Sequence, residues 1–113
     1  MSNVKIDRLG SNFVKIISEI LATEIKDENI KFVTITSCEV TNDLSFAKVY
    51  FTVFDMTKKK ETLKALEKAK SFIRGEISKR INIRHTPELR FIFDESIEYG
   101  NKIEKIINDI NNK

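Results

Sequence analysis

Apolar residues in the first 26 positions recur every three or four residues, whereas after position 30 they alternate with polar ones. The first pattern predicts an amphipathic helix over about residues 4–26, on the order of 33 Å long, with one buried face. Two runs rich in β-branched residues follow at 30–40 and 44–54. The turn formers Thr41-Asn42-Asp43 separate them, so the two runs should pair as a hairpin.

The spacing of apolar residues becomes helical again over about residues 60–81. Ser71 and Gly75 are weak helix formers within this segment, so a kink or a break into two helices is expected near Lys70 and Ser71. The predicted buried stripe of this segment consists of Leu63, Leu66, Ala69, Phe72, Ile73, Ile77 and Ile81.

A third strand and a last helix complete the predicted elements. Residues 88–94 alternate apolar and polar side chains, and Ser96 can cap a helix that runs to about residue 110. The order α-β-β-α-(kink)-α-β-α predicts an α+β fold in which helices cover a three-stranded sheet. Residues 1–110 are expected to form a single domain, and residues 111–113 a short tail.

The charge of the chain is strongly asymmetric. Between Lys58 and Arg90 there are eleven Lys or Arg against four Glu, a balance of +7, while the remainder stands at −4 and the total is +3. Such clustering is typical of a surface that contacts phosphates. A solvated helix face would also carry Lys and Arg, but only Glu61, Glu67 and Glu76 are available to compensate the charges along this helix.

Residues able to support catalysis are few and scattered. His85, the only histidine, lies in a basic segment beside Arg84 without a nucleophile nearby, so an exposed or phosphate-facing role is favoured over catalysis. Cys38 is the only cysteine and is expected to be a small buried thiol on the first strand. A single cysteine excludes an internal disulfide and a cysteine-based zinc site. No catalytic residue, metal site or cofactor is therefore predicted.

No segment is suited to membrane insertion or export. No apolar run approaches the roughly 20 residues that a membrane span needs, and the N-terminal residues lack the apolar core of a signal peptide. We therefore expect a soluble, intracellular protein in a reducing compartment.

Several aromatic residues fall on the predicted strands. Phe91 and Phe93 share a strand face with apolar neighbours and are expected in the core. Phe46, Tyr50 and Phe54 lie on the opposite face of their strand from its core residues. Because sheet-borne aromatic side chains stack bases in some RNA modules, base stacking is one interpretation of these three residues, and packing against helices is the favoured one.

Four ordered blocks of sequence resemble the ribosome-binding factor A family of bacterial small-subunit assembly factors, and the resemblance covers nearly the whole chain. The blocks are 40–50 (VTNDLSFAKVY), 69–74 (AKSFIR), 83–91 (IRHTPELRF) and 93–96 (FDES). The resemblance implies a KH-like domain of the second type, with a helix-kink-helix in place of the usual GxxG loop. The kink of the family is generally Ala-x-Gly, and here Ser71 follows Ala69 at the glycine position.

The resemblance also implies a function without catalysis. Such a protein binds the free, immature small ribosomal subunit, promotes maturation of its rRNA near the 5′ end and supports growth in the cold. The implied partner is small-subunit rRNA, bound in the cytoplasm by a monomer, with no membrane and no small-molecule substrate. The kink is placed at Ala69, Lys70 and Ser71. The predicted RNA-binding residues are Arg8, Lys68, Lys70, Ser71, Arg74, Lys79, Arg80, Arg84 and Arg90.

Two functions of other classes stay open. In the first, the chain is a protein-interaction module in which the exposed sheet face or the first helix docks a ribosomal protein or a GTPase. In the second, it is a small hydrolase or nuclease, for which neither a metal site nor a general base is found. Six phosphate contacts would give a log–log salt dependence of binding of about −4 to −5, and a slope near zero would count against RNA binding. Charge reversal at Arg80 and Arg84 distinguishes RNA binding from the first alternative, and loss of a turnover activity on His85→Ala would favour the second.

Overall fold

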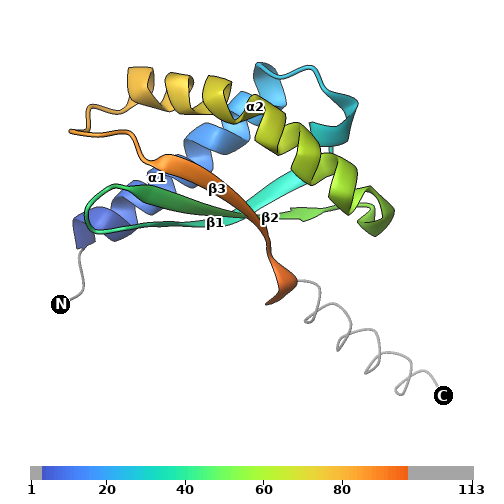
Figure 1. Cartoon of the computed structure of the whole chain (residues 1–113), viewed down its shortest axis with the longest axis horizontal. Helices are drawn as coiled ribbons and strands as arrows, with labels where there is room; N and C mark the ends of the chain where they lie inside the picture. Colours follow the sequence, from blue (N-terminus) through green and yellow to red (C-terminus); the bar gives the residue numbers. More distant parts are fainter. Residues whose placement is uncertain (1–3, 97–113) are drawn as a thin grey trace.

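The computed structural model describes residues 4–96, in which two long helices lie on one face of a three-stranded sheet (Figure 1). The helices and strands are α1 (Val4–Thr23), β1 (Val33–Val40), β2 (Phe46–Val53), α2 (Lys59–Arg80) and β3 (Glu88–Phe93), with short 3-10 helices η1 (Glu28–Ile30) and η2 (Met56–Lys58). Neither long helix within this part of the chain is long and apolar enough to span a lipid bilayer.

The sheet has the order β1-β2-β3 and is mixed. β1 and β2 form the predicted antiparallel hairpin, in which Val40 pairs with Ala47 beside the turn. β3 runs parallel to β2, with Phe46 opposite Glu88. Parallel neighbours need a long crossover connection, and α2 provides it by passing over the sheet (Figure 1).

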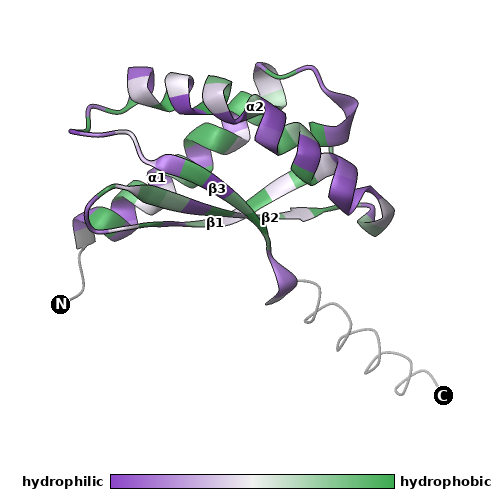
Figure 2. Ribbon diagram, viewed as in Figure 1, coloured by the Kyte–Doolittle hydropathy of each residue, from purple (hydrophilic) through white to green (hydrophobic). Residues whose placement is uncertain are grey.

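The hydrophobic core lies between the sheet and the two helices. Figure 2 shows hydrophobic residues along the strands and α1, and hydrophilic residues over much of α2. The predicted alternation in β2 is confirmed, because Ala47, Val49 and Phe51 are fully buried. In β3, Phe91 is buried and Phe93 packs edge-on against Phe51 at 5.8 Å between ring centroids.

α2 agrees with its prediction in part. It is one continuous helix from Lys59 to Arg80, so of the kink or break expected from the sequence the break does not occur, and the helix axis changes direction between its green and yellow parts in Figure 1. The buried stripe is also displaced, because Leu63 and Phe72 are exposed while Thr62 and Ala65 are buried. The prediction placed Leu63 and Phe72 in the core because their side chains are large and apolar. Small side chains such as those of Thr62 and Ala65 instead allow close packing.

The ends of two helices also differ from the predictions. α1 ends at Thr23, and Asp27 then caps η1 by accepting a hydrogen bond from the backbone N–H of Asn29 at 2.9 Å. After β3, the Asp94 carboxylate accepts the backbone N–H of Ser96 at 3.1 Å. Asp94 therefore holds the capping position, for which the sequence offers both Asp94 and Ser96. The rest of the predicted last helix, and the tail 111–113, lie outside the described residues.

Candidate nucleic-acid interface

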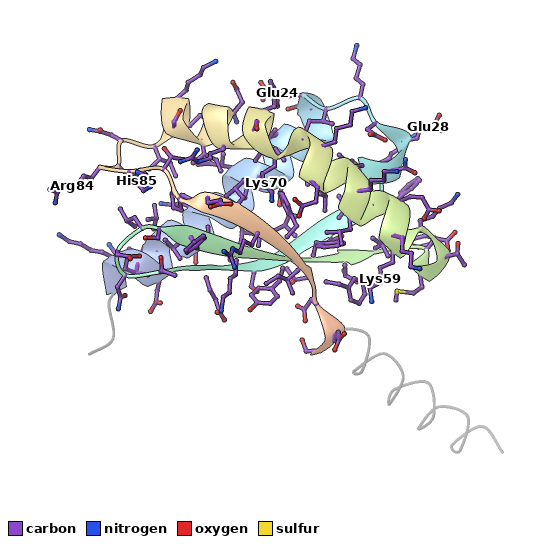
Figure 3. The ribbon with its side chains drawn as sticks, viewed as in Figure 1. Glu24, Glu28, Lys59, Lys70, Arg84 and His85 are labelled. Atoms are coloured by element: carbon purple, nitrogen blue, oxygen red, sulfur yellow. The ribbon has the colours of Figure 1, made fainter. Side chains whose placement is uncertain are left out.

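A shallow groove of about 500 Å³ lies between the C-terminal half of α2 and the loop that leads to β3. Figure 3 shows Arg84 and His85 at the tip of this loop. We call this feature the α2–loop groove; its lining residues are Ser71, Arg74, Gly75, Ser78, Ile83, Arg84, His85 and Thr86. Three of the predicted RNA-binding residues, Ser71, Arg74 and Arg84, thus come together.

Arg74 fixes the geometry of the groove. Its Nη2 donates a hydrogen bond to the carbonyl oxygen of Thr86 at 2.7 Å, and its Nε donates to the carbonyls of Thr86 and Pro87, both at 3.2 Å. Pro87 is fully buried, so the end of the loop is anchored in the core. The guanidinium therefore ties α2 to the loop and sets where Arg84 and His85 stand.

Replacing Arg74 by Lys should loosen the loop while keeping the charge. An ammonium group cannot reproduce the planar fork that reaches both carbonyls. We expect a loss of about 1 kcal/mol in unfolding free energy and faster amide exchange in residues 83–86. Lys68→Met, which removes a cation from the exposed side of α2, is the matched control and should change neither quantity. Unchanged exchange in the Arg74→Lys protein would show that the fork does not hold the loop.

Arg80 is surrounded by carboxylates. Its guanidinium lies 3.8 Å from Glu19 of α1, 3.0 Å from Glu24 just after the end of α1, and 3.5 Å from Glu76 of its own helix. These ion pairs connect the end of α2 to α1. Arg80 is thus a cation whose charge is locally compensated, which the spacing of charges along α2 alone did not reveal.

Two predicted lysines also have carboxylate partners one turn away. Lys70 pairs with Glu67, and Lys79 donates to Glu76 at 3.1 Å. The hydrogen bond from Lys79, and then the charges of Lys79 and Arg80, lower the pKa of Glu76, which keeps this carboxyl ionised. Exposed ion pairs of this kind contribute little to stability and can open to another anion. They nevertheless reduce the positive potential of this part of α2.

The remaining predicted cations lie in three separate places. Lys68 is exposed on α2 and Arg8 is exposed on α1. Arg90 belongs to the sheet face opposite the helices, where its guanidinium lies over the Phe46 ring at 4.1 Å from the centroid. Because the sheet lies between Arg90 and α2, this arginine and the α2–loop groove cannot contact the same stretch of a ligand.

The residues at the predicted kink face different ways. Ala69 packs against the core, whereas Ser71 is exposed and lines the groove. Residues 69–71 of α2 therefore contribute a hydroxyl to the groove and a small side chain to the interior. Sequence reasoning did not assign Ser78 or Thr86 to the site; the block 83–91 that carries the family resemblance was the available signal for Thr86.

Cys38 is a poor candidate for chemistry. Burial, followed by the neighbouring Glu39 carboxylate, raises the pKa of its thiol to about 12. Within residues 4–96, no three His, Cys, Asp or Glu side chains gather closely enough to hold a metal ion. Cys38 was predicted to be buried; in the structure it is partly buried on β1 and packs against the core.

The raised pKa predicts slow thiol chemistry in the folded protein. At pH 8 only the thiolate reacts, and the raised pKa makes the thiolate fraction far lower in the native protein than in the unfolded chain. Ellman's reagent should accordingly label Cys38 slowly in native buffer and rapidly in denaturant. Equal rates in the two conditions would contradict the burial of this thiol.

Comparison with known proteins places the chain among its relatives. The family profile described as ribosome-binding factor A matches residues 5–107. The chain belongs to the ribosome-binding factor A family. It is 50% identical over 114 aligned residues to ribosome-binding factor A of Staphylococcus carnosus, covering 100% of this chain and 99% of that protein. It is 47% identical to the Macrococcus caseolyticus protein of the same name, covering 96% of each.

Solved structures agree with the architecture. The crystal structure of ribosome-binding factor A from Thermus thermophilus aligns with a TM-score of 0.68 at 24% identity, over 77% of this chain and 93% of that one. A homology model of the Thermus thermophilus ribosome-binding factor A, as fitted into the cryo-EM map of its 30S complex, aligns with a TM-score of 0.67 at 20% identity, over 80% of this chain and 96% of that one. The KH-like fold expected from the resemblance is thereby confirmed. This is a family of ribosome-binding factors and is not known as a family of enzymes.

Proposed function

We propose that this protein binds the free, immature small ribosomal subunit in the cytoplasm and promotes maturation of its rRNA near the 5′ end, without catalysing a reaction. The observation that carries the proposal is the α2–loop groove, a polar groove with arginine side chains in a member of the ribosome-binding factor A family. The Thermus thermophilus relative described in a 30S complex supports the choice of subunit.

The groove offers the groups that hold an RNA backbone. Arg84 is exposed and, among the described residues, has no carboxylate partner. The Ser71 hydroxyl lies in the same groove and can donate to a phosphate oxygen. Phosphate contacts of this kind position a protein on RNA without reading its sequence. Selectivity would then come from the shape of the rRNA.

Binding of this type can promote maturation by a shift of populations. If the groove fits one rRNA conformation better than another, occupancy of the protein biases the subunit toward that conformation. The magnitude of the bias equals the difference in affinity for the two conformations. No bond is made or broken by the protein in this scheme.

Sedimentation with separated ribosomal particles tests the proposal. The tagged full chain should co-migrate with free small subunits and not with large subunits or assembled ribosomes. Cells lacking the protein should accumulate small-subunit rRNA precursors that are unprocessed at the 5′ end. Equal association with all particles, or with none, would overturn the proposal.

One observation favours the alternative that the chain is a protein-interaction module. The positive charges of Arg80, Lys79 and Lys70 are paired with carboxylates. Binding to small subunits that is insensitive to salt would favour it. In that case a ribosomal protein or a GTPase would replace rRNA as the direct partner.

A further inference from the structure

Two phenylalanine side chains lie exposed at the end of the β1–β2 hairpin that is remote from its turn. Phe54 is 89% exposed and Phe32 is 66% exposed, although large aromatic side chains are usually more buried. Their ring centroids are 6.2 Å apart and the ring planes are tilted by 45°. We call this pair the Phe32–Phe54 platform.

A backbone hydrogen bond joins the two residues of the platform. The N–H of Phe54 donates to the carbonyl oxygen of Phe32 at 3.2 Å, which extends the hairpin ladder by one step beyond Val33 and Val53. Phe32 and Phe54 therefore lie one residue outside β1 and β2, and this hydrogen bond joins their backbones. A rigid support of this kind lowers the entropy that a ligand must remove on binding.

A pocket of about 390 Å³ adjoins the rings, and the residues that line it include both positively and negatively charged side chains. Lys31 and Lys58 stand beside Glu28 and Asp55, and the Lys31 ammonium lies 5.8 Å from the centroid of the Phe32 ring. Asp55 is engaged at the start of η2, where it accepts the N–H and the hydroxyl of Thr57 at 3.0 and 2.7 Å. The pocket is near neutral, which suits the face of a base better than a phosphate.

The cations that line this pocket are Lys31 and Lys58. Lys59 and Lys60 follow at the start of α2, and the Lys59 ammonium lies over the Phe93 ring at 4.1 Å from its centroid. Proteins hold single-stranded RNA by combining aromatic rings that stack on the bases with nearby cations that contact the backbone. A docked protein segment would gain nothing from the Lys31 and Lys58 ammonium groups unless it were acidic.

We infer that the Phe32–Phe54 platform stacks an unpaired base of RNA, at a site separate from the α2–loop groove. In Figure 3, Glu28 and Lys59 mark one end of the molecule, and Arg84 and His85 mark the other. The inference rests on the proposed function in so far as RNA is the partner. It adds a second contact, so that one molecule would touch two rRNA segments at once.

Titration of the isotope-labelled full chain with oligouridylate and oligoadenylate at low salt tests this inference by NMR. We expect the ring signals of Phe32 and Phe54 to shift on binding. Phe54→Leu keeps an apolar side chain but removes the stacking face, and should weaken binding by about tenfold, whereas Phe54→Trp should preserve it. Since Phe54 is 89% exposed, both substitutions should leave the fold unchanged.

The outcomes separate this inference from the proposed function. Shifts confined to the α2–loop groove, or equal affinity of the Phe54→Leu and wild-type proteins, would overturn the platform as a base-binding site. Ring signals that respond to a ribosomal protein and not to RNA would also overturn it. Arg84→Glu should leave the shifts at the platform in place. Loss of small-subunit binding by Arg84→Glu alone would leave the proposed function standing, whatever the result at Phe54.

Discussion

Replacing Arg84 by Glu should reduce binding to the free small subunit by about 100-fold, which corresponds to about 3 kcal/mol, because it places a carboxylate where we propose an rRNA phosphate. Arg84 is exposed at the tip of the loop. The substitution should therefore leave the unfolding free energy unchanged. Quantitative sedimentation or filter binding with purified subunits would measure the affinity, and thermal unfolding would measure the stability.

Lys15→Glu is the matched control for this substitution. Lys15 is exposed on α1 and is not among the residues that line the groove, and the variant changes the net charge by the same amount. Its affinity should fall only slightly. Equal losses in the two variants would mean that net charge, and not the groove, governs binding. Arg80→Glu is a poorer test, because it would add a carboxylate beside Glu24 and Glu76 and disturb the contact between the helices.

Replacing Gly10 by Ala should lower the unfolding free energy by about 3 kcal/mol. Gly10 is buried where α1 crosses β1, and a Cβ there would overlap the backbone carbonyl oxygen of Cys38. A backbone atom cannot rotate away as the end of a side chain can, so α1 would have to move from the sheet. The loss should exceed the gain of about 1 kcal/mol that Ala normally brings to a helix interior.

Gly75→Ala provides the opposite result within the same protein. Gly75 lies inside α2 and a Cβ there would meet nothing within 4 Å. We expect stabilisation by about 0.5–1 kcal/mol. Denaturant unfolding of both variants gives the comparison directly. If Gly10→Ala were as stable as the wild-type protein, the close approach of α1 to β1 would be wrong.

The elements that the sequence predicted correctly are those in which one face is buried and the spacing of apolar residues shows which face it is. α1 and the hairpin were identified because their apolar spacing and the turn at Thr41-Asn42-Asp43 are local features. The parallel pairing of β3 with β2 depends on where α2 carries the chain, and no local pattern shows it. The displaced stripe of α2 has the same origin, because the sheet accepts Thr62 and Ala65 where size alone favoured Leu63.

The sequence predicted which types of residue form the candidate site, but only part of how these residues are arranged in space. Ser71, Arg74 and Arg84 do meet in one groove. Two of the three carboxylate partners of Arg80, Glu19 and Glu24, are more than fifty positions away in sequence, so only Glu76 could be seen as a neighbour on its own helix. The hydrogen bonds of Arg74 to the loop likewise arise only when the chain has folded.

The compensated cations change the expected number of phosphate contacts. Lys70, Lys79 and Arg80 have carboxylate partners, and Arg90 stands on the other face of the sheet. The predicted cations without a carboxylate partner in residues 4–96 are Arg74 and Arg84 in the groove, Lys68 on the exposed side of α2 and Arg8 on α1. About four phosphate contacts replace the six that the sequence suggested.

The dependence of small-subunit affinity on salt tests the proposed phosphate contact most directly. For about four contacts, the logarithm of the association constant should fall with the logarithm of salt concentration with a slope of about −3. Arg84→Gln should make that slope shallower by about one. A slope near zero for the wild-type protein, or a slope that Arg84→Gln leaves unchanged, would contradict the proposal that the α2–loop groove holds rRNA phosphates.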